Sequence, residues 1–146
     1  MEARIEVQKV FVHSWLIQTR PMADTIILKE ESYEIIGACM EVHNNLGTGF
    51  TEIVYKDALE YEFTKRHIPF EREKQYKVHY KDIILSHLFY ADFVVFDSII
   101  LEVKCVSEFT SEFTAQCLNY LQVSGNQLAL LVNFGALRLQ YKRVVL

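Results

Sequence analysis

The chain has 146 residues, of which 51% are hydrophobic and 23% are charged, as expected for one soluble domain with a core of its own. Its formal net charge of −4 argues against a protein that coats nucleic acid regardless of sequence, although a local basic groove is compatible with this charge. No apolar run is long enough to span a membrane, and no basic region followed by an apolar core begins the chain. We therefore expect neither a membrane anchor nor a signal peptide.

Residues 1–21 differ from the rest of the chain. They show no clear period, and Pro21 is followed by a second methionine, Met22, and then by a strongly patterned segment. Two interpretations are open: an added strand or arm, and an extension that the domain does not need. We expect an N-terminal extension over residues 1–21 and one domain over residues 22–146.

Two helices are expected next. Apolar residues recur near a helical period over residues 31–45, and Gly47 suits the end of a helix. Thr48 or Thr51 can cap a second helix, which ends before Pro69.

After Pro69 the pattern changes to that of strands. Alternating and continuous apolar runs predict three strands, a helix and a final strand pair, over residues 71–81, 83–96, 99–106, 110–125, 127–135 and 137–146. The order α-α-β-β-β-α-β-β predicts a mixed sheet flanked by helices, in the α/β (α+β) class.

The three cysteines, Cys39, Cys105 and Cys117, are far apart and lack any C-x-x-C spacing. Their odd number and their spacing argue against a disulfide scaffold, a zinc site or an iron–sulfur cluster. Reduced thiols are the simplest interpretation, and we expect a cytoplasmic protein.

Glu102 and Lys104 interrupt an otherwise apolar strand, where charged groups are costly unless they are paired or used. Strand side chains alternate, so these two share a face and lie about 7 Å apart. Asp92 joins them only if it lies opposite Glu102, which requires an odd-length loop, such as residues 96–98, or a bulge. A two-residue turn would place Asp92 on the face of Val103. The sequence leaves this register open.

Two carboxylates are hard oxygen ligands that suit Mg²⁺ or Mn²⁺. A backbone carbonyl, such as that of Val103, and waters could complete the shell. Such a metal lowers the pKa of a bound water and stabilises charge on a phosphate. Lys104 beside it can orient the attacking water or neutralise the developing negative charge.

These residues match a known family. The stretch "YADFVVFDSIILEVK", residues 90–104, resembles the D-x(n)-E-x-K core of the PD-(D/E)XK nuclease superfamily, whose core order is α-β-β-β-α-β. "GFTEIVY", residues 49–55, fits the pattern that names the GxxExxY protein family, a branch of this superfamily. Gln116 and Tyr120 fit the Q-x-x-x-Y pattern of recombination-type nucleases. The resemblance covers residues 27–145 and implies a restriction-endonuclease-like fold.

The resemblance also implies roles for individual residues. Asp92 and Glu102 would be metal ligands, and Lys104 would be the catalytic lysine. Glu52, on the second helix, would be an additional acid that holds a metal-bound water or a second metal. The cofactor would be Mg²⁺ or Mn²⁺.

Three further residues follow from the same resemblance. Gln116 would position Lys104 or substrate, and Tyr120 would support it or contact the phosphate backbone. Tyr55 is expected to pack the helix of Glu52 against the sheet. Where the superfamily often has Pro before the first Asp, this chain has Ala91.

The implied activity is hydrolysis of nucleic acid, with DNA as the expected substrate and RNA as the alternative that the sequence leaves open. A homodimer or a partner protein would add surface for the substrate. The alternative is a catalytically silent domain that acts as a binding or assembly module. The acidic balance and the lack of an obvious basic stripe favour the module, and the complete set of carboxylates and lysine argues against it.

Overall fold

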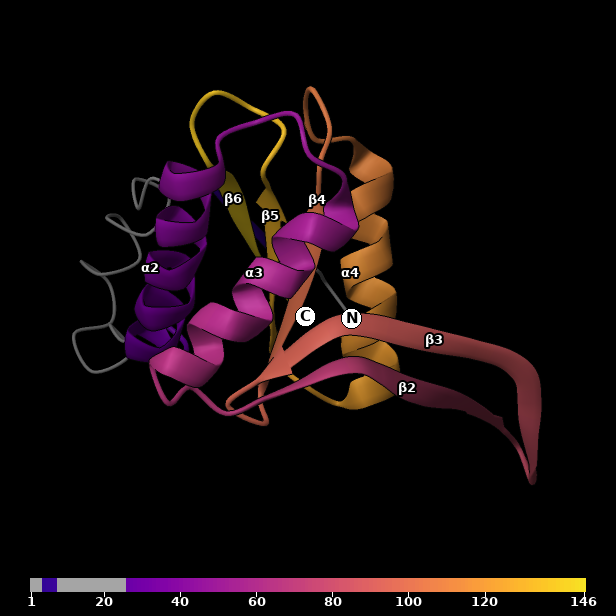
Figure 1. Ribbon diagram of the computed structural model, residues 1–146. Coiled ribbons are helices and arrows are strands. Elements are labelled where there is room, and N and C mark those ends of the chain that lie inside the picture. Colours follow the sequence, from indigo (N-terminus) through magenta and orange to yellow (C-terminus); the bar gives the residue numbers. More distant parts are fainter. Residues whose placement is uncertain (1–3, 8–25) are drawn as a thin grey trace, which may run out of the picture.

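The computed structural model describes residues 4–7 and 26–146, which form one mixed sheet with helices on both faces (Figure 1). In chain order the elements are β1 (Arg4–Val7), α2 (Lys29–Leu46), α3 (Glu52–Lys65), β2 (Phe70–Tyr80), β3 (Ile83–Val95), β4 (Ile99–Lys104), α4 (Ser111–Ser124), β5 (Leu128–Asn133) and β6 (Gln140–Val145). The predicted order and class are confirmed, with β1 as an added strand.

The sheet has the strand order β1-β6-β5-β4-β3-β2. β4 and β5 run parallel, and the other neighbouring pairs run antiparallel. Through residues 4–7, β1 pairs with β6, as in the first interpretation of the N-terminal residues. Residues 1–3 and 8–21 lie outside the described part of the chain, and the domain boundary at residue 22 stays a prediction.

The ends of the first two helices follow from local chemistry. α2 ends because Gly47 adopts a φ of 67°, which suits glycine, and its N–H donates to the carbonyl of His43 at 2.8 Å. Thr51 holds the position before α3 in extended backbone, although its side chain makes no capping hydrogen bond. The sequence therefore located both helix ends within a few residues.

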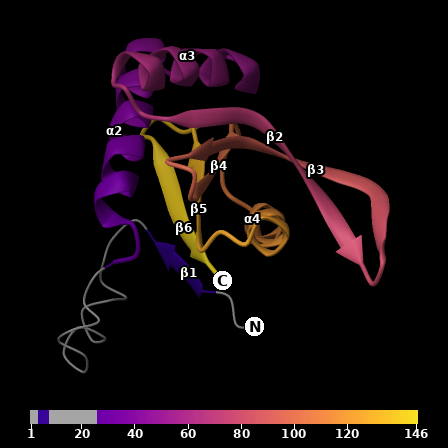
Figure 2. The same cartoon turned by 90° about the horizontal axis from the view of Figure 1, so that it is seen from below.

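Alternation along β4 divides the core into two layers. Ile99 and Leu101 pack with α2 and α3, whereas Ile100 packs with α4 (Figure 2). Each of these side chains is fully buried, which stabilises the fold by about 1.5–3 kcal/mol per side chain. The same alternation directs Glu102 and Lys104 toward α4.

β4 is shorter than the predicted strand, which ran to Val106. It ends at Lys104 because the buried side chain of Asn133 takes both backbone groups of Val106. Asn133 Oδ1 accepts from the Val106 N–H, and Asn133 Nδ2 donates to the Val106 carbonyl, each at 2.9 Å. The Asn133 side chain thus takes the place of the next pair of backbone hydrogen bonds and holds the chain in position just after Lys104.

Gly135 packs against the backbone of Val106 with no room for a side chain. A Cβ atom here would lie 2.4 Å from the Val106 carbonyl oxygen and 2.6 Å from its nitrogen. We expect Gly135→Ala to lower the free energy of unfolding in urea by about 3 kcal/mol, because overpacking strains the backbone. The control is Gly37→Ala in α2, where the Cβ would lie 3.4 Å from the Arg66 guanidinium; we expect it to stabilise by about 1 kcal/mol. Equal effects of the two substitutions would contradict overpacking as the cause.

β2 and β3 extend beyond the body of the protein as a two-stranded hairpin (Figure 1, Figure 2). β4 pairs only with residues 93–95 of β3, so the earlier part of β3 has only β2 as a neighbour in the described sheet. We call residues 74–90 the arm.

Candidate active site

The turn between β3 and β4 decides whether a site forms. It consists of residues 96–98, an odd-length loop, and the strands pair in the register Phe93↔Leu101, Val94↔Ile100 and Val95↔Ile99. The same register carried one pair further places Asp92 opposite Glu102. The arrangement that the site needs is therefore the one that the chain adopts.

Asp92 and Glu102 connect β3 and β4 just beyond the last backbone pair between these strands. Glu102 Oε1 accepts a hydrogen bond from the Asp92 N–H at 3.0 Å, and Asp92 Oδ2 accepts one from the Val103 N–H at 2.8 Å. Both side chains are buried, with Glu102 only 2% exposed. Burial raises the pKa of Glu102 well above its usual range, and the charge of Asp92 raises it further. A cation at this point would relieve that repulsion.

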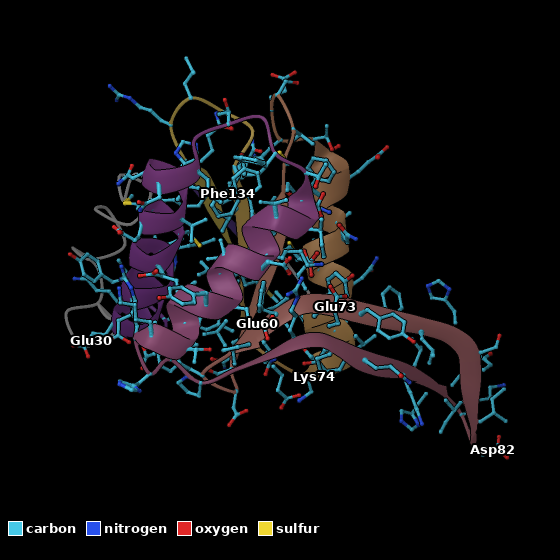
Figure 3. All side chains as sticks on the ribbon, viewed as in Figure 1. Glu30, Glu60, Glu73, Lys74, Asp82 and Phe134 are labelled. Atoms are coloured by element: carbon cyan, nitrogen blue, oxygen red, sulfur yellow. The ribbon has the colours of Figure 1, made fainter. Side chains whose placement is uncertain are left out.

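Asp92 forms an ion pair with Lys56 of α3, a residue that the sequence reasoning missed. Its Nζ lies 2.9 Å from Asp92 Oδ1 and also forms an ion pair with Glu73 of β2, which lies beside α3 (Figure 3). Burial lowers the pKa of Lys56, but the hydrogen bonds with Glu73 and Asp92 and the charges of these two carboxylates together outweigh burial and raise the pKa overall. Lys56 follows Glu52 by four residues and so shares its helical face, which was the signal available in the sequence.

Glu52 is exposed as the first residue of α3. Partial burial raises its pKa, the charge of Lys104 lowers it, and the charge of Asp92 raises it. α3 thus brings Glu52 close enough to Lys104 on β4 and Asp92 on β3 for their charges to affect its pKa.

Lys104 is held from the side of α4. Its Nζ donates to Gln116 Oε1 at 2.9 Å and lies 4.9 Å from the centre of the Phe113 ring. A cation over an aromatic face is stabilised electrostatically. The ammonium therefore has a defined position on the same strand as Glu102.

Tyr120 connects α4 to the start of the arm. Its hydroxyl donates to the carbonyl of Tyr90 at 2.7 Å. Burial and the charges of Glu102 and Asp92 raise the pKa of Tyr120, and they outweigh a hydrogen bond with Gln116 that lowers it. Its main observed contact is thus with β3 backbone, and a role toward substrate stays a prediction.

Tyr55 has a packing role, as expected. Its ring stacks on Phe134 with centroids 4.7 Å apart, and its hydroxyl donates to the carbonyl of Gly47 at 2.6 Å. These contacts fix the first turn of α3, which carries Glu52.

The residues present supply oxygen ligands of the kind that Mg²⁺ and Mn²⁺ prefer. Within residues 4–7 and 26–146, however, no three His, Cys, Asp or Glu side chains converge closely enough to hold an ion. In the described structure the two carboxylates are engaged within the protein: Asp92 Oδ1 contacts Lys56, and one oxygen each of Asp92 and Glu102 accepts from backbone N–H. Metal binding by Asp92, Glu102, Glu52 and the Val103 carbonyl stays a prediction.

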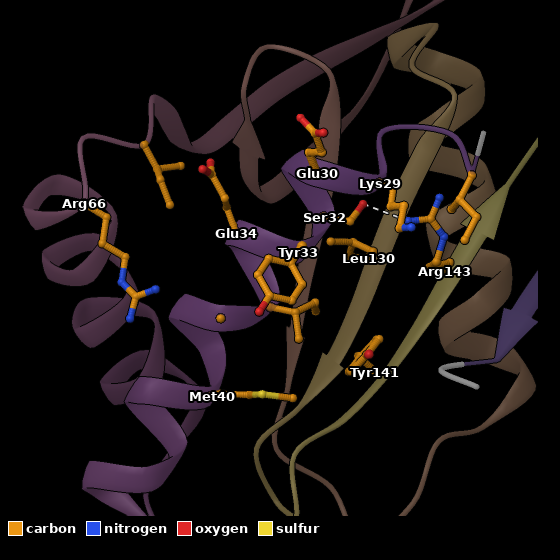
Figure 4. Close-up of a pocket in the computed structure, with 14 residues that line it drawn as sticks. Lys29, Glu30, Ser32, Tyr33, Glu34, Met40, Arg66, Leu130, Tyr141 and Arg143 are labelled. Atoms are coloured by element: carbon orange, nitrogen blue, oxygen red, sulfur yellow. Dashed lines mark hydrogen bonds between the residues drawn. The ribbon is translucent and has the colours of Figure 1, made fainter. Parts of the chain in front are cut away.

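A pocket of about 820 Å³ lies elsewhere, beside α2 (Figure 4). Its lining includes Tyr33, Met40 and Tyr141, and Arg143 donates to Ser32 Oγ at 2.8 Å. None of the residues considered for the active site lines it. The pocket and the candidate site are therefore separate.

Residues 29–144 match the family model described as the PD-(D/E)XK nuclease superfamily. No curated protein and no solved structure matches the chain. The match does not test the GxxExxY branch, which stays a prediction.

Among the helices of the described residues, none has the length and apolar character needed to cross a membrane.

Proposed function

Because the chain belongs to the PD-(D/E)XK nuclease superfamily, we propose that it is a metal-dependent nuclease that hydrolyses phosphodiester bonds of nucleic acid, with DNA as the expected substrate and RNA as the alternative. The observation that carries this proposal is the pairing of Asp92 on β3 with Glu102 on β4, just beyond the last backbone pair of these strands. Lys104 lies on the same strand as Glu102. Structure alone does not demand two buried carboxylates beside each other with a lysine two residues after one of them.

Members of the superfamily typically use divalent metals. In this chain Asp92, Glu102 and Glu52 would hold Mg²⁺ or Mn²⁺, with the Val103 carbonyl as a further ligand. The metal would supply Lewis-acid stabilisation of the phosphate and acidify a bound water. Binding requires that Asp92 Oδ1 exchange its ion pair with Lys56 for the metal.

Lys104, Gln116 and Tyr120 would stabilise the transition state and position the groups that act on it. Lys104, fixed by Gln116 and Phe113, would neutralise charge that develops on the phosphate, where a fixed ammonium is most effective. Gln116 would act by keeping that ammonium in place. Tyr120 would hold the strand from which Asp92 projects.

One observation favours the second candidate function, a catalytically silent binding or assembly module. The Lys56 ammonium already compensates the charge of Asp92, as in a structural ion pair that needs no metal. The two functions differ in whether the carboxylates bind an ion.

Calorimetric titration with Mn²⁺ separates the two functions. We expect the wild type to bind Mn²⁺, to cleave DNA with Mg²⁺ and to lose cleavage in EDTA. Asp92→Ala should bind Mn²⁺ at least about tenfold more weakly, because it removes a ligand. The control, Asp57→Ala, removes an exposed aspartate from α3 and should leave binding unchanged. No binding by the wild type, or equal binding by Asp92→Ala, would support the module.

A further inference from the structure

The arm, residues 74–90, leaves large side chains in solvent. Tyr80 is 55% exposed, Ile83 54%, Ile84 53% and Tyr90 47%. A two-stranded hairpin is marginally stable in water by itself, and a cluster of exposed apolar side chains marks a binding surface. The arm therefore has the features of a surface that another molecule covers.

The arm is also locally basic. It carries Lys74, Lys77 and Lys81 against one acid, Asp82, whereas acidic residues outnumber basic ones in the chain as a whole. Lys81 lies 5.4 Å from the centre of the Tyr80 ring. Lysines beside exposed aromatic rings suit nucleic acid, because the lysines attract phosphates and the rings stack on bases.

The arm starts at the candidate active site. Tyr90 precedes Asp92 by two residues on β3, and Tyr120 fixes the Tyr90 carbonyl. At strand geometry, the part of β3 from Ile83 to Asp92 reaches about 30 Å. A nucleic-acid strand on the arm would therefore lead directly to the carboxylates.

From these observations, and on the premise of the proposed nuclease function, we propose that the arm binds a single-stranded segment of the nucleic-acid substrate next to the scissile phosphate. Lys77 and Lys81 contact phosphates, and Tyr80 stacks on a base. A single strand is favoured over a duplex because its bases expose their faces, whereas a duplex hides them in the stack. Ile83 pairs with Tyr80 across the hairpin, and its apolar side chain suits a base face and has no use against a phosphate backbone.

The lysine test measures binding of a labelled single-stranded DNA 20-mer by the full chain, by fluorescence anisotropy in EDTA, over a range of salt concentrations. We expect Lys77→Ala/Lys81→Ala to bind roughly tenfold more weakly at about 0.1 M salt. The slope of log Kobs against log salt should flatten by about 0.7 for each phosphate that a lysine no longer neutralises. The control, Lys29→Ala/Lys65→Ala, removes two exposed lysines from α2 and α3 and should keep the wild-type slope.

The tyrosine test separates stacking from charge. Tyr80→Ala should weaken single-strand binding about tenfold without changing the salt slope, because stacking on one base carries no counterion release. Tyr61→Ala removes a tyrosine that is 67% exposed on α3 and should bind like the wild type. The wild type should also bind the single strand more tightly than a duplex of the same sequence.

The outcomes distinguish a failure of the arm proposal from a failure of the proposed nuclease function. If the wild type binds and cleaves DNA but both arm variants behave like their controls, the arm proposal is wrong and the nuclease proposal stands. If light scattering shows a wild-type dimer that Ile83→Glu/Ile84→Glu converts to monomers, with DNA binding unchanged, the arm is an interface between copies and our proposal is overturned. If the wild type neither binds nor cleaves nucleic acid, the proposed function itself is wrong.

Discussion

Lys104→Met is expected to slow DNA cleavage roughly 100- to 1,000-fold, the effect of removing one group that stabilises transition-state charge. Methionine keeps an apolar chain for contact with Phe113 but lacks the ammonium that Gln116 holds. The rate should be measured in single turnovers at saturating Mg²⁺. Mn²⁺ binding by calorimetry should be unchanged, because Lys104 is not a proposed ligand.

Lys142→Met is the matched control for this variant. Lys142 is also a half-buried lysine on a strand, and its Nζ lies 5.1 Å from the centre of the Phe109 ring. It lies on β6, separated from Glu102 by the intervening strand β5, and has no proposed role in the chemistry, so its loss should leave the cleavage rate within about twofold of wild type. A Lys104→Met enzyme that cleaves at the wild-type rate would remove Lys104 from the mechanism.

Lys56→Met should have opposite effects on stability and on metal affinity. Without metal it leaves the buried Asp92 carboxylate without its ammonium, which costs about 3–5 kcal/mol of unfolding free energy. Because the ammonium and the metal compete for Asp92 Oδ1, the variant should bind Mn²⁺ about tenfold or more tightly, and each tenfold change corresponds to about 1.4 kcal/mol. Urea unfolding in EDTA and in Mn²⁺ measures both, and Mn²⁺ should stabilise the variant more than the wild type.

The control for Lys56→Met is Lys65→Met, which removes an exposed lysine from the last turn of the same helix. Its stability in EDTA should change by less than about 0.5 kcal/mol, and its Mn²⁺ affinity should not change. Weaker Mn²⁺ binding by Lys56→Met would mean that the ammonium orients Asp92 for the metal, and the competition would then be excluded.

The sequence by itself determined the secondary structure and the chemical character of the site. Apolar runs located β4 and β5 to within a few residues because these strands are buried on both faces. The glycine after α2 and the proline after α3 marked helix ends by backbone geometry. Glu102 and Lys104 were recognisable because burying charge is costly wherever the strand lies.

Only the tertiary structure decided how these groups meet. The register that sets Asp92 against Glu102 depends on a three-residue turn in which Phe96 and Asp97 adopt positive φ, a conformation that is uncommon for Phe and that Asp adopts more often than most residues. Lys56 reaches Asp92 because α3 packs against the face of the sheet beside β4 (Figure 1). The two residues are 36 positions apart, and such a contact depends on how the helix packs on the sheet, which local propensities do not encode.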